Sequence, residues 1–231
     1  MAAPPASFTG ARQKSALSAE RIAAEALSLI DSEGLEGFSF RTLAARLSCK
    51  AMSLYHYYPS KAHLFEALID ICIAEIVPPS ADGWRERIRV FAQAFRQIAL
   101  RHPGFYIYFA TFRMNNRAGL GLLNQILKAF EETGLPAELR ARHFRAMGYF
   151  LAGAGIEEAL GYDRGPSSVN PVSDAEVARL FPAILAVGPY FAPKYRDMTF
   201  DAGLDALLDA IAADIARAQA GPTPAEPPAR G

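Results

Sequence analysis

The sequence is poor in cysteine and contains no long apolar run. Its two cysteines, Cys49 and Cys72, form no C-x-x-C pair, so neither a disulfide framework nor a cysteine-rich zinc site is expected. No hydrophobic stretch reaches the roughly eighteen residues that a membrane span requires, and residues 1–15 lack the apolar centre of a signal peptide. We therefore predict a cytoplasmic protein without a membrane segment.

Residue patterns typical of enzymes are also missing. The histidines are scattered and form no H-E-x-x-H motif, and no G-x-S-x-G elbow is present. Gly119-Leu120-Gly121 follows no predicted strand, so it is not expected to be a dinucleotide-binding loop. Glu157 and Glu158 are adjacent and point about 100° apart on a helix, so they cannot both face one site. The sequence predicts no catalytic residue, no metal site and no cofactor.

Acidic residues are absent from one stretch near the start of the chain. The formal net charge of the 231 residues is zero, but no Asp or Glu lies between Glu36 and Glu66. The basic residues of this stretch are Arg41, Arg46, Lys50 and Lys61. A polyanion can approach such a surface without like-charge repulsion. The alternative is that these residues are ordinary solvated side chains and that the nearby tyrosines belong to a core.

The same stretch has the pattern of two short helices joined by a tight turn. From Phe40 to Leu47 apolar residues recur at three- and four-residue spacing, as on one face of a helix, and Ser39 is suited to be its N-cap. Residues 48–50 form a turn of the length used in helix-turn-helix pairs. A second helix is predicted over about residues 51–57, which makes it the candidate recognition helix.

The two faces of this second helix differ in chemistry. At about 100° per residue, the inward positions are Ala51, Leu54 and Tyr58. The outward positions are Met52, Ser53 and His56, flanked by Tyr55 and Tyr57. A solvated helix would carry Lys and Glu on its outer face. Hydroxyls, an imidazole and aromatic rings can instead contact base edges, thymine methyl groups and phosphates in a major groove.

The run LAARLSCKAMSLYHYYPSKAHLFEAL resembles the N-terminal domain of TetR-type transcriptional regulators. The family signature L-Y-x-H/Y-F-x-x-K-x-x-L corresponds to residues 54–64, and the resemblance covers about residues 18–73. Two positions depart from the family pattern, because Ser48 replaces the usual Gly and Cys49 an aliphatic residue. Ser48 is therefore expected to adopt a positive φ, which strains a residue with a Cβ.

The resemblance also implies roles for individual residues. Those expected to contact bases are Arg41, Met52, Ser53 and His56. Those expected to contact phosphates are Thr42, Lys50, Tyr55, Tyr57 and Lys61. The partners that it implies are double-stranded operator DNA, a small-molecule effector and a second copy of the chain.

The rest of the sequence predicts an all-α protein with two domains. A first helix is expected over residues 18–33, ended by Gly34, and a fourth is expected to be capped by Ser60 and to end near Val77. The predicted divisions are a disordered arm (1–16), a three-helix helix-turn-helix domain with its connecting helix (17–77), a larger helical effector-binding and dimerisation domain (78–219) and a disordered tail (220–231). No convincing alternating strand pattern is found.

An aromatic cluster marks a candidate ligand pocket in the larger domain. Five aromatic residues lie between Phe105 and Phe112. The candidate ligand-binding residues are Tyr106, Phe109, Phe112, Arg113 and Tyr149. Arg113 follows the cluster and could anchor a carboxylate or phenolate, and no acid lies between Glu86 and Glu131, so an apolar or anionic effector is expected. The alternative is that the aromatic residues are core.

Two further helices are expected to form a dimer interface. Residues 152–155 are all Gly or Ala and allow a close helix–helix seam. The last helix, predicted over about residues 200–218, has an apolar stripe of Leu204, Leu208, Ile211 and Ile215. Paired with their two-fold mates, these helices would make a four-helix bundle. Between them, residues 174–190 are predicted to be helical with a break at Pro182.

The sequence as a whole indicates a homodimeric DNA-binding regulator whose larger domain binds a small molecule. Release from the operator on ligand binding is the commonest arrangement in the resembled family, and an activator or a regulator that needs a co-repressor stays open. The competing hypothesis is a helical small-molecule-binding or catalytic protein without specific DNA binding.

Overall fold

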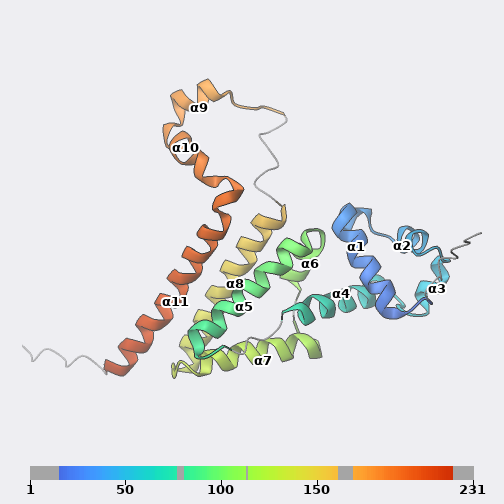
Figure 1. Ribbon diagram of the computed structural model, residues 1–231, viewed down its shortest axis with the longest axis horizontal. Coiled ribbons are helices and arrows are strands. Elements are labelled where there is room, and N and C mark those ends of the chain that lie inside the picture. Colours follow the sequence, from blue (N-terminus) through green and yellow to red (C-terminus); the bar gives the residue numbers. More distant parts are fainter. Residues whose placement is uncertain (1–15, 77–80, 113, 161–168, 221–231) are drawn as a thin grey trace, which may run out of the picture.

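The computed structural model describes residues 16–76, 81–112, 114–160 and 169–220. Within these ranges the chain forms helices and connecting loops and no strand, which confirms the all-α prediction. A small N-terminal unit lies at one end of the molecule and a larger helical unit at the other (Figure 1). Almost all of the expected arm and tail, together with Arg113, lie outside the described residues.

The N-terminal unit consists of four helices. They are α1 (Ala19–Gly37), α2 (Phe40–Arg46), α3 (Ala51–Tyr55) and α4 (Lys61–Glu75). Ser18, Ser39 and Ser60 each accept a hydrogen bond from the backbone N–H three residues later, as an N-cap does. Gly34 breaks the regular helix with a φ of 77°, as expected, although α1 resumes as far as Gly37.

The core of this unit is defined by its buried side chains. The fully or nearly buried side chains are those of Ile22, Ala26, Leu29, Phe38, Leu43, Leu47 and Leu54. Leu35, Phe40 and Tyr58 are partly buried against them. Tyr58 also donates a hydrogen bond of 3.0 Å to the carbonyl of Ala19. Burying each large aliphatic side chain contributes about 1.5–3 kcal/mol, so this core holds α2 and α3 on α1.

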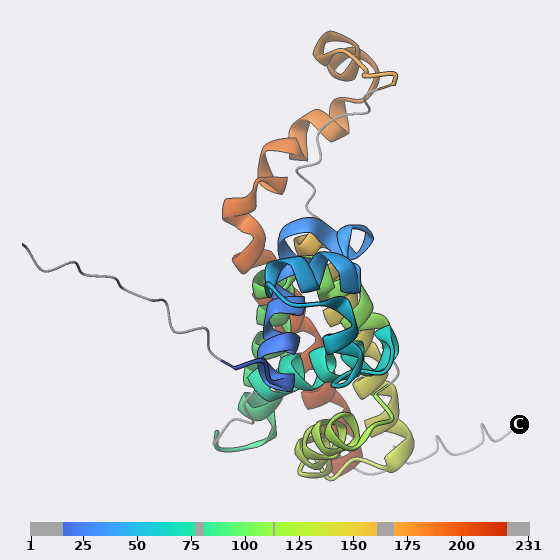
Figure 2. The same cartoon turned by 90° about the vertical axis from the view of Figure 1, so that its right-hand side faces the viewer.

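The larger unit is built on α5 (Trp84–Arg101), α6 (Pro103–Thr111), α7 (Arg117–Glu131), α8 (Ala137–Leu160) and α11 (Arg196–Ala220). Helix α8 packs against α5, α6, α7 and α11. The two views in Figures 1 and 2 show α9 (Asp174–Leu180) and α10 (Pro182–Val187) projecting away from this body. The predicted break at Pro182 is present, because Phe181 has non-helical dihedral angles.

The apolar stripe of α11 faces the chain's own core. Leu204, Leu208 and Ile211 are buried within the single chain, and Ile215 is partly buried. The expectation that this stripe faces a second copy is therefore corrected: its partners are intramolecular. Helix α11 also begins at Arg196, four residues before the predicted start at Phe200.

A buried ion network, which the sequence analysis did not anticipate, fastens the start of α11. Arg96 on α5 is 8% exposed and donates from Nε to both carboxylate oxygens of Glu158 on α8, at 2.7 and 2.9 Å. Its Nη2 donates to Asp197 at 2.7 Å, and its guanidinium lies 4.6 Å from the ring centre of Phe200. Removing Arg96 would leave the buried carboxylate of Glu158 without this partner, so this network orders α5, α8 and α11 together.

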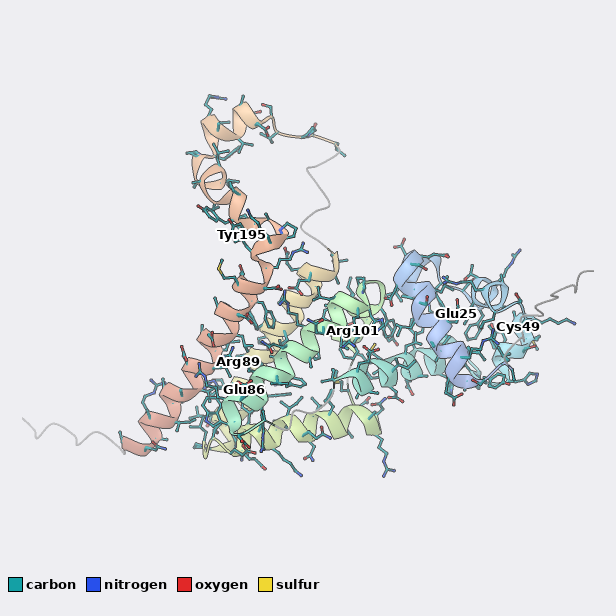
Figure 3. All side chains as sticks on the ribbon, in the orientation of Figure 1. Glu25, Cys49, Glu86, Arg89, Arg101 and Tyr195 are labelled. Atoms are coloured by element: carbon teal, nitrogen blue, oxygen red, sulfur yellow. The ribbon has the colours of Figure 1, made fainter. Side chains whose placement is uncertain are left out.

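The two units meet where α1 packs on α6 and where the end of α4 reaches α5 and α7. A Cβ added to Gly104, in the first turn of α6, would lie 2.2 Å from the carbonyl oxygen of Ile30 on α1. The neighbouring His102 links three segments: its Nδ1 is 2.7 Å from Asp31 on α1 and its Nε2 is 3.1 Å from Glu75 on α4. Arg101, labelled in Figure 3, pairs with the same Glu75 at 2.8 Å.

Gly155 accounts for how closely α6 and α8 approach. A Cβ at this position would lie 2.1 Å from the hydroxyl oxygen of Tyr106, which donates to the carbonyl of Leu151 at 3.0 Å. We predict that Gly155→Ala lowers the free energy of unfolding by about 2 kcal/mol, because Tyr106 must move in a packed core. Gly148→Ala on the same helix is the matched control: nothing lies within 4 Å of its added Cβ, and helix propensity favours Ala by about 1 kcal/mol. Equal losses in urea unfolding would contradict this account.

The His102 cluster predicts a pH-dependent stability. Both ring nitrogens face carboxylates and only the imidazolium donates from both, so the hydrogen bond with Asp31, opposed by burial and aided by Glu75, raises the pKa of His102. A raised folded-state pKa stabilises the protein below the unfolded value of about 6.5, and the gain is lost as pH rises through the folded value. His102→Gln should therefore cost about 2 kcal/mol at pH 6 and less at pH 9.

Thermal unfolding at several pH values between 6 and 9 measures this difference. His56→Gln is the control, because the exposed His56 ring has no hydrogen-bond partner within the described residues. A stability difference between wild type and His102→Gln that stays constant with pH would refute the charged state of His102.

Candidate nucleic-acid interface and ligand cavity

Helix α3 presents the predicted outward set to solvent. Met52 is 70% exposed, Tyr55 43% and Tyr57 42%, and His56 is also exposed, whereas Leu54 is fully buried. Ser53 is half-buried. The helix ends at Tyr55, two residues earlier than predicted, so His56 and Tyr57 lie in the turn that follows it. The large exposed side chains form one surface that no element of the described chain covers.

The turn before α3 is set by an unusual backbone conformation. Ser48 has a φ of 52° and is the one non-glycine residue with a positive φ in the described part of the chain. Its N–H donates to Ala45 at 3.1 Å, and the next N–H, of Cys49, donates to Ala44 at 3.0 Å. The expected positive φ is thus confirmed. A serine in this region carries about 1–2 kcal/mol of strain, which the surrounding packing must offset.

The predicted cations differ in whether they form ion pairs within the chain. Arg41 and Lys50 are exposed and have no ion-pair partner within the described residues. Arg46, by contrast, points back to α1, where its Nε lies 2.7 Å from Glu25 (Figure 3) and its Nη1 donates to Ser32 at 3.1 Å. The four-cation surface expected from the sequence is corrected, because Arg46 is used to join α2 to α1.

Thr42 and Lys61 have structural partners of their own. The Thr42 hydroxyl accepts from the N–H of Ser39 at 2.9 Å and lies 2.8 Å from its carbonyl, which completes a capping box at the start of α2. The Lys61 ammonium lies 5.2 Å from the ring centre of Phe38 and 4.8 Å from that of Phe65. Lys61 nevertheless stays exposed in the first turn of α4.

The two flanking tyrosines are held in place by the N-terminal unit. The ring of Tyr55 meets that of Phe40 edge-on, with their centres 4.7 Å apart. The hydroxyl of Tyr57 donates to the carbonyl of Leu17 at 2.8 Å. A phosphate that accepts from Tyr57 would have to replace Leu17. Both rings are therefore ordered before any DNA arrives.

The larger unit contains a cavity of about 250 Å³ between α5, α7, α8 and the segment that joins α6 to α7. We call this cavity the chamber. The described residues of its lining are all apolar: Ile88, Phe91, Phe95, Ala110, Phe112, Met114, Leu122, Leu123, Ile126, Phe130, Phe144, Met147, Gly148, Leu151 and Ala152. It has the size and lining of a small-ligand site.

The predicted ligand residues are not all brought to this chamber. Phe112 lines it, but Tyr106 and Phe109 are fully buried in the core beside it, as the alternative interpretation of the aromatic cluster held. Burial raises the pKa of the Tyr106 hydroxyl, which is consistent with a hydroxyl that stays protonated. Tyr149 is 70% exposed and does not line the chamber.

Sequence reasoning missed most of the chamber wall. Phe91 and Phe95 on α5 are four residues apart, and Phe144, Met147 and Leu151 recur at three- and four-residue spacing on α8. That spacing could have been recognised as two apolar helix faces. It could not have shown that the two faces enclose a space.

Metal-binding clusters and membrane-spanning helices are features of other protein classes. Within the described ranges no group of three or more His, Cys, Asp or Glu residues could hold a metal ion. No described helix is long and apolar enough to cross a membrane.

Comparison with known proteins agrees with both halves of this architecture. Residues 22–68 match the family model "Bacterial regulatory proteins, tetR family", and residues 78–215 match "Tetracyclin repressor-like, C-terminal domain". Among solved structures, a possible TetR family transcriptional regulator from Streptomyces coelicolor A3(2) superposes with a TM-score of 0.70 at 22% identity, over 85% of this chain and 99% of that one. Apo ActR from Streptomyces coelicolor gives 0.67 at 24% identity, over 87% and 98%. At such identities these two structures support the fold alone.

Curated relatives align along most of the chain. The tetracycline repressor protein class A from transposon 1721 of Escherichia coli is 29% identical over 195 residues, which cover 81% of this chain and 87% of that protein. The HTH-type transcriptional repressor DrrR1 of Streptomyces coeruleorubidus is 26% identical over 226 residues, covering 88% and 80%. Because the C-terminal model spans more than half of the chain and the tetR model covers the helix-turn-helix, this chain belongs to the TetR family of bacterial transcriptional regulators.

Proposed function

We propose that this protein is a homodimeric, sequence-specific DNA-binding repressor that leaves its operator when a small ligand occupies the chamber. The observation that carries the proposal is the exposure of Met52, Tyr55 and His56 on α3 and the turn after it, in the same unit as the exposed cations Arg41 and Lys50. We propose a cytoplasmic location and no catalytic activity. No observation favours the alternative of a helical protein without DNA binding.

The chemistry of this surface suits a major groove. The His56 imidazole can donate to or accept from purine edges, and the Met52 side chain can contact a thymine methyl group. We propose that Arg41 and Ser53 also contact bases. The proposed phosphate contacts are those of Thr42, Lys50, Tyr55, Tyr57 and Lys61, which fix the register of α3 without reading sequence.

We propose that residues 17–77 form the DNA-binding domain and residues 78–219 the effector-binding and dimerisation domain. Helix α4 connects the two, and Ile76, its C-cap residue, lines a second cavity of about 180 Å³ beside the chamber. Ile88 and Leu122 line both cavities. A ligand that enters from the chamber side can therefore press on the C-terminal end of α4, the helix that follows α3. Such coupling requires unequal ligand affinity for the two arrangements of α4.

The effector is proposed to be a small molecule with an apolar body. Every described residue that lines the chamber is apolar, so a ligand there gains mainly from burial of its own apolar surface. The structural relative ActR has been solved in complex with actinorhodin, at 23% identity to this chain. That complex supports the idea that a helical unit of this fold holds a ligand.

A homodimer would cover surfaces that one chain leaves open. Gly153 on α8 and Ala202 and Ala206 on α11 are exposed small residues, which let helices of a second copy approach closely. The projecting segment that contains α9 and α10 exposes Ile184 (59%) and Tyr190 (64%). Exposed apolar groups of this size are unfavourable in water and favour contact with a partner.

Selection from a random-sequence duplex library tests the proposed function. Purified full-length protein should enrich one sequence motif, and the enriched duplex should compete better than random DNA at every salt concentration. Failure to enrich any motif over several rounds, by a folded protein, would leave the regulator proposal without its first requirement.

Two substitutions should separate base contacts from phosphate contacts on the selected duplex. His56→Ala should weaken the selected site by about 1–3 kcal/mol and random DNA little, because a base contact is lost. Lys50→Ala should weaken both alike and reduce the slope of log K against log salt by about 0.9, because one phosphate contact is lost. Fluorescence anisotropy measures both effects. Equal weakening of all sequences by His56→Ala would refute its base-reading role.

A further inference from the structure

A second cavity of different chemistry lies beside the chamber. The two share the walls Ile88, Phe91, Leu122 and Ile126. The described lining of the chamber has no polar side chain, whereas the second cavity adds Arg87, Gln125 and Lys128. We call these three residues the lip. A ligand that displaces the shared side chains can reach from an apolar space to a polar one.

One of the two cations of the lip, Lys128, has no ion-pair partner among the described residues. Arg87 is already occupied: its Nε donates to the carbonyl of Ala81 at 2.8 Å and its Nη1 pairs with Glu132. Lys128 is exposed and has no ion-pair or hydrogen-bond partner for its ammonium in the described part of the chain. Gln125 lies three residues earlier on α7, so the amide and the ammonium lie on neighbouring turns of one face.

We propose that the effector is an amphipathic anion whose apolar body fills the chamber and whose acid group lies at the lip, paired with Lys128 and hydrogen-bonded by Gln125. This assignment rests on the proposed role of the chamber as the effector site. A carboxylate, sulfonate or phenolate supplies the required charge.

Other ligand classes fit the two cavities less well. A charge placed inside the chamber would lose its hydration and find no polar side chain among the described lining residues, so charged groups are favoured at the lip. An organic cation at the lip would meet Lys128 with like charge. A neutral ligand would leave Lys128 unused.

A matched pair of fluorescent probes tests the charge requirement. The probes are 8-anilinonaphthalene-1-sulfonate and N-phenyl-1-naphthylamine, which share the ring system and differ in the sulfonate. In titrations of the full-length protein, Lys128→Gln should weaken the sulfonate probe about fivefold and leave the neutral probe unchanged. Lys128→Arg should retain the affinity, and Arg117→Gln, an exposed cation at the other end of α7, should change neither probe.

A second substitution shows whether the probes occupy the chamber at all. Ala110 on α6 is half-buried and lines it, so Ala110→Leu should fill part of the chamber and weaken both probes at least tenfold. Ala152→Leu, which enters the chamber from α8, is the replacement if Ala110→Leu does not fold.

The outcomes separate the inference from the function on which it rests. If filling the chamber weakens both probes but Lys128→Gln spares the sulfonate, the charge assignment is overturned and the chamber stands as a ligand site. If filling the chamber weakens neither probe, the proposed effector site is overturned and the charge assignment with it.

Discussion

The close contact between α1 and α6 is the constraint on which the rest of the molecule depends. Gly104 allows the two backbones to meet, since even a methyl group there would overlap the carbonyl oxygen of Ile30. Beside this contact, His102 bonds to a carboxylate on α1 and to another on α4. The N-terminal unit, with the exposed surface of α3, is therefore fixed to the larger unit by packing and by charge together. It is not carried on a loose linker.

This attachment gives ligand binding a physical route to the DNA surface. The chamber lies between α5, α7 and α8. The neighbouring cavity lies between α5, α7 and Ile76, at the end of α4. One end of α4 lies beside the second cavity, and the other end packs against the core beneath α3. A ligand that favours a different position of Ile76 would shift α4, while the α1–α6 contact sets the pivot. Two chains moving in this way would change the separation of their recognition helices.

The sequence predicts well what local chemistry decides. The N-cap at Ser39 and the positive φ at Ser48 depend on neighbouring residues, and both are present in the structure. It predicts poorly what distant partners decide. Tyr106 is drawn into the core because Gly155 leaves room for its ring, and Arg46 turns from the DNA surface because Glu25 on α1 attracts it. No local pattern shows either partner, so the faces of α6 and α2 could not be assigned in full.

Two copies of α3 are proposed to bind in successive major grooves of one DNA duplex. Hydroxyl-radical footprinting of a selected duplex, with the number of bound chains measured in parallel, tests this arrangement most directly. We expect two protected patches centred about 34 Å, or one helical turn, apart, and two chains for each pair of patches. A single patch held by one chain, or protection that is the same on unselected DNA, would contradict the account.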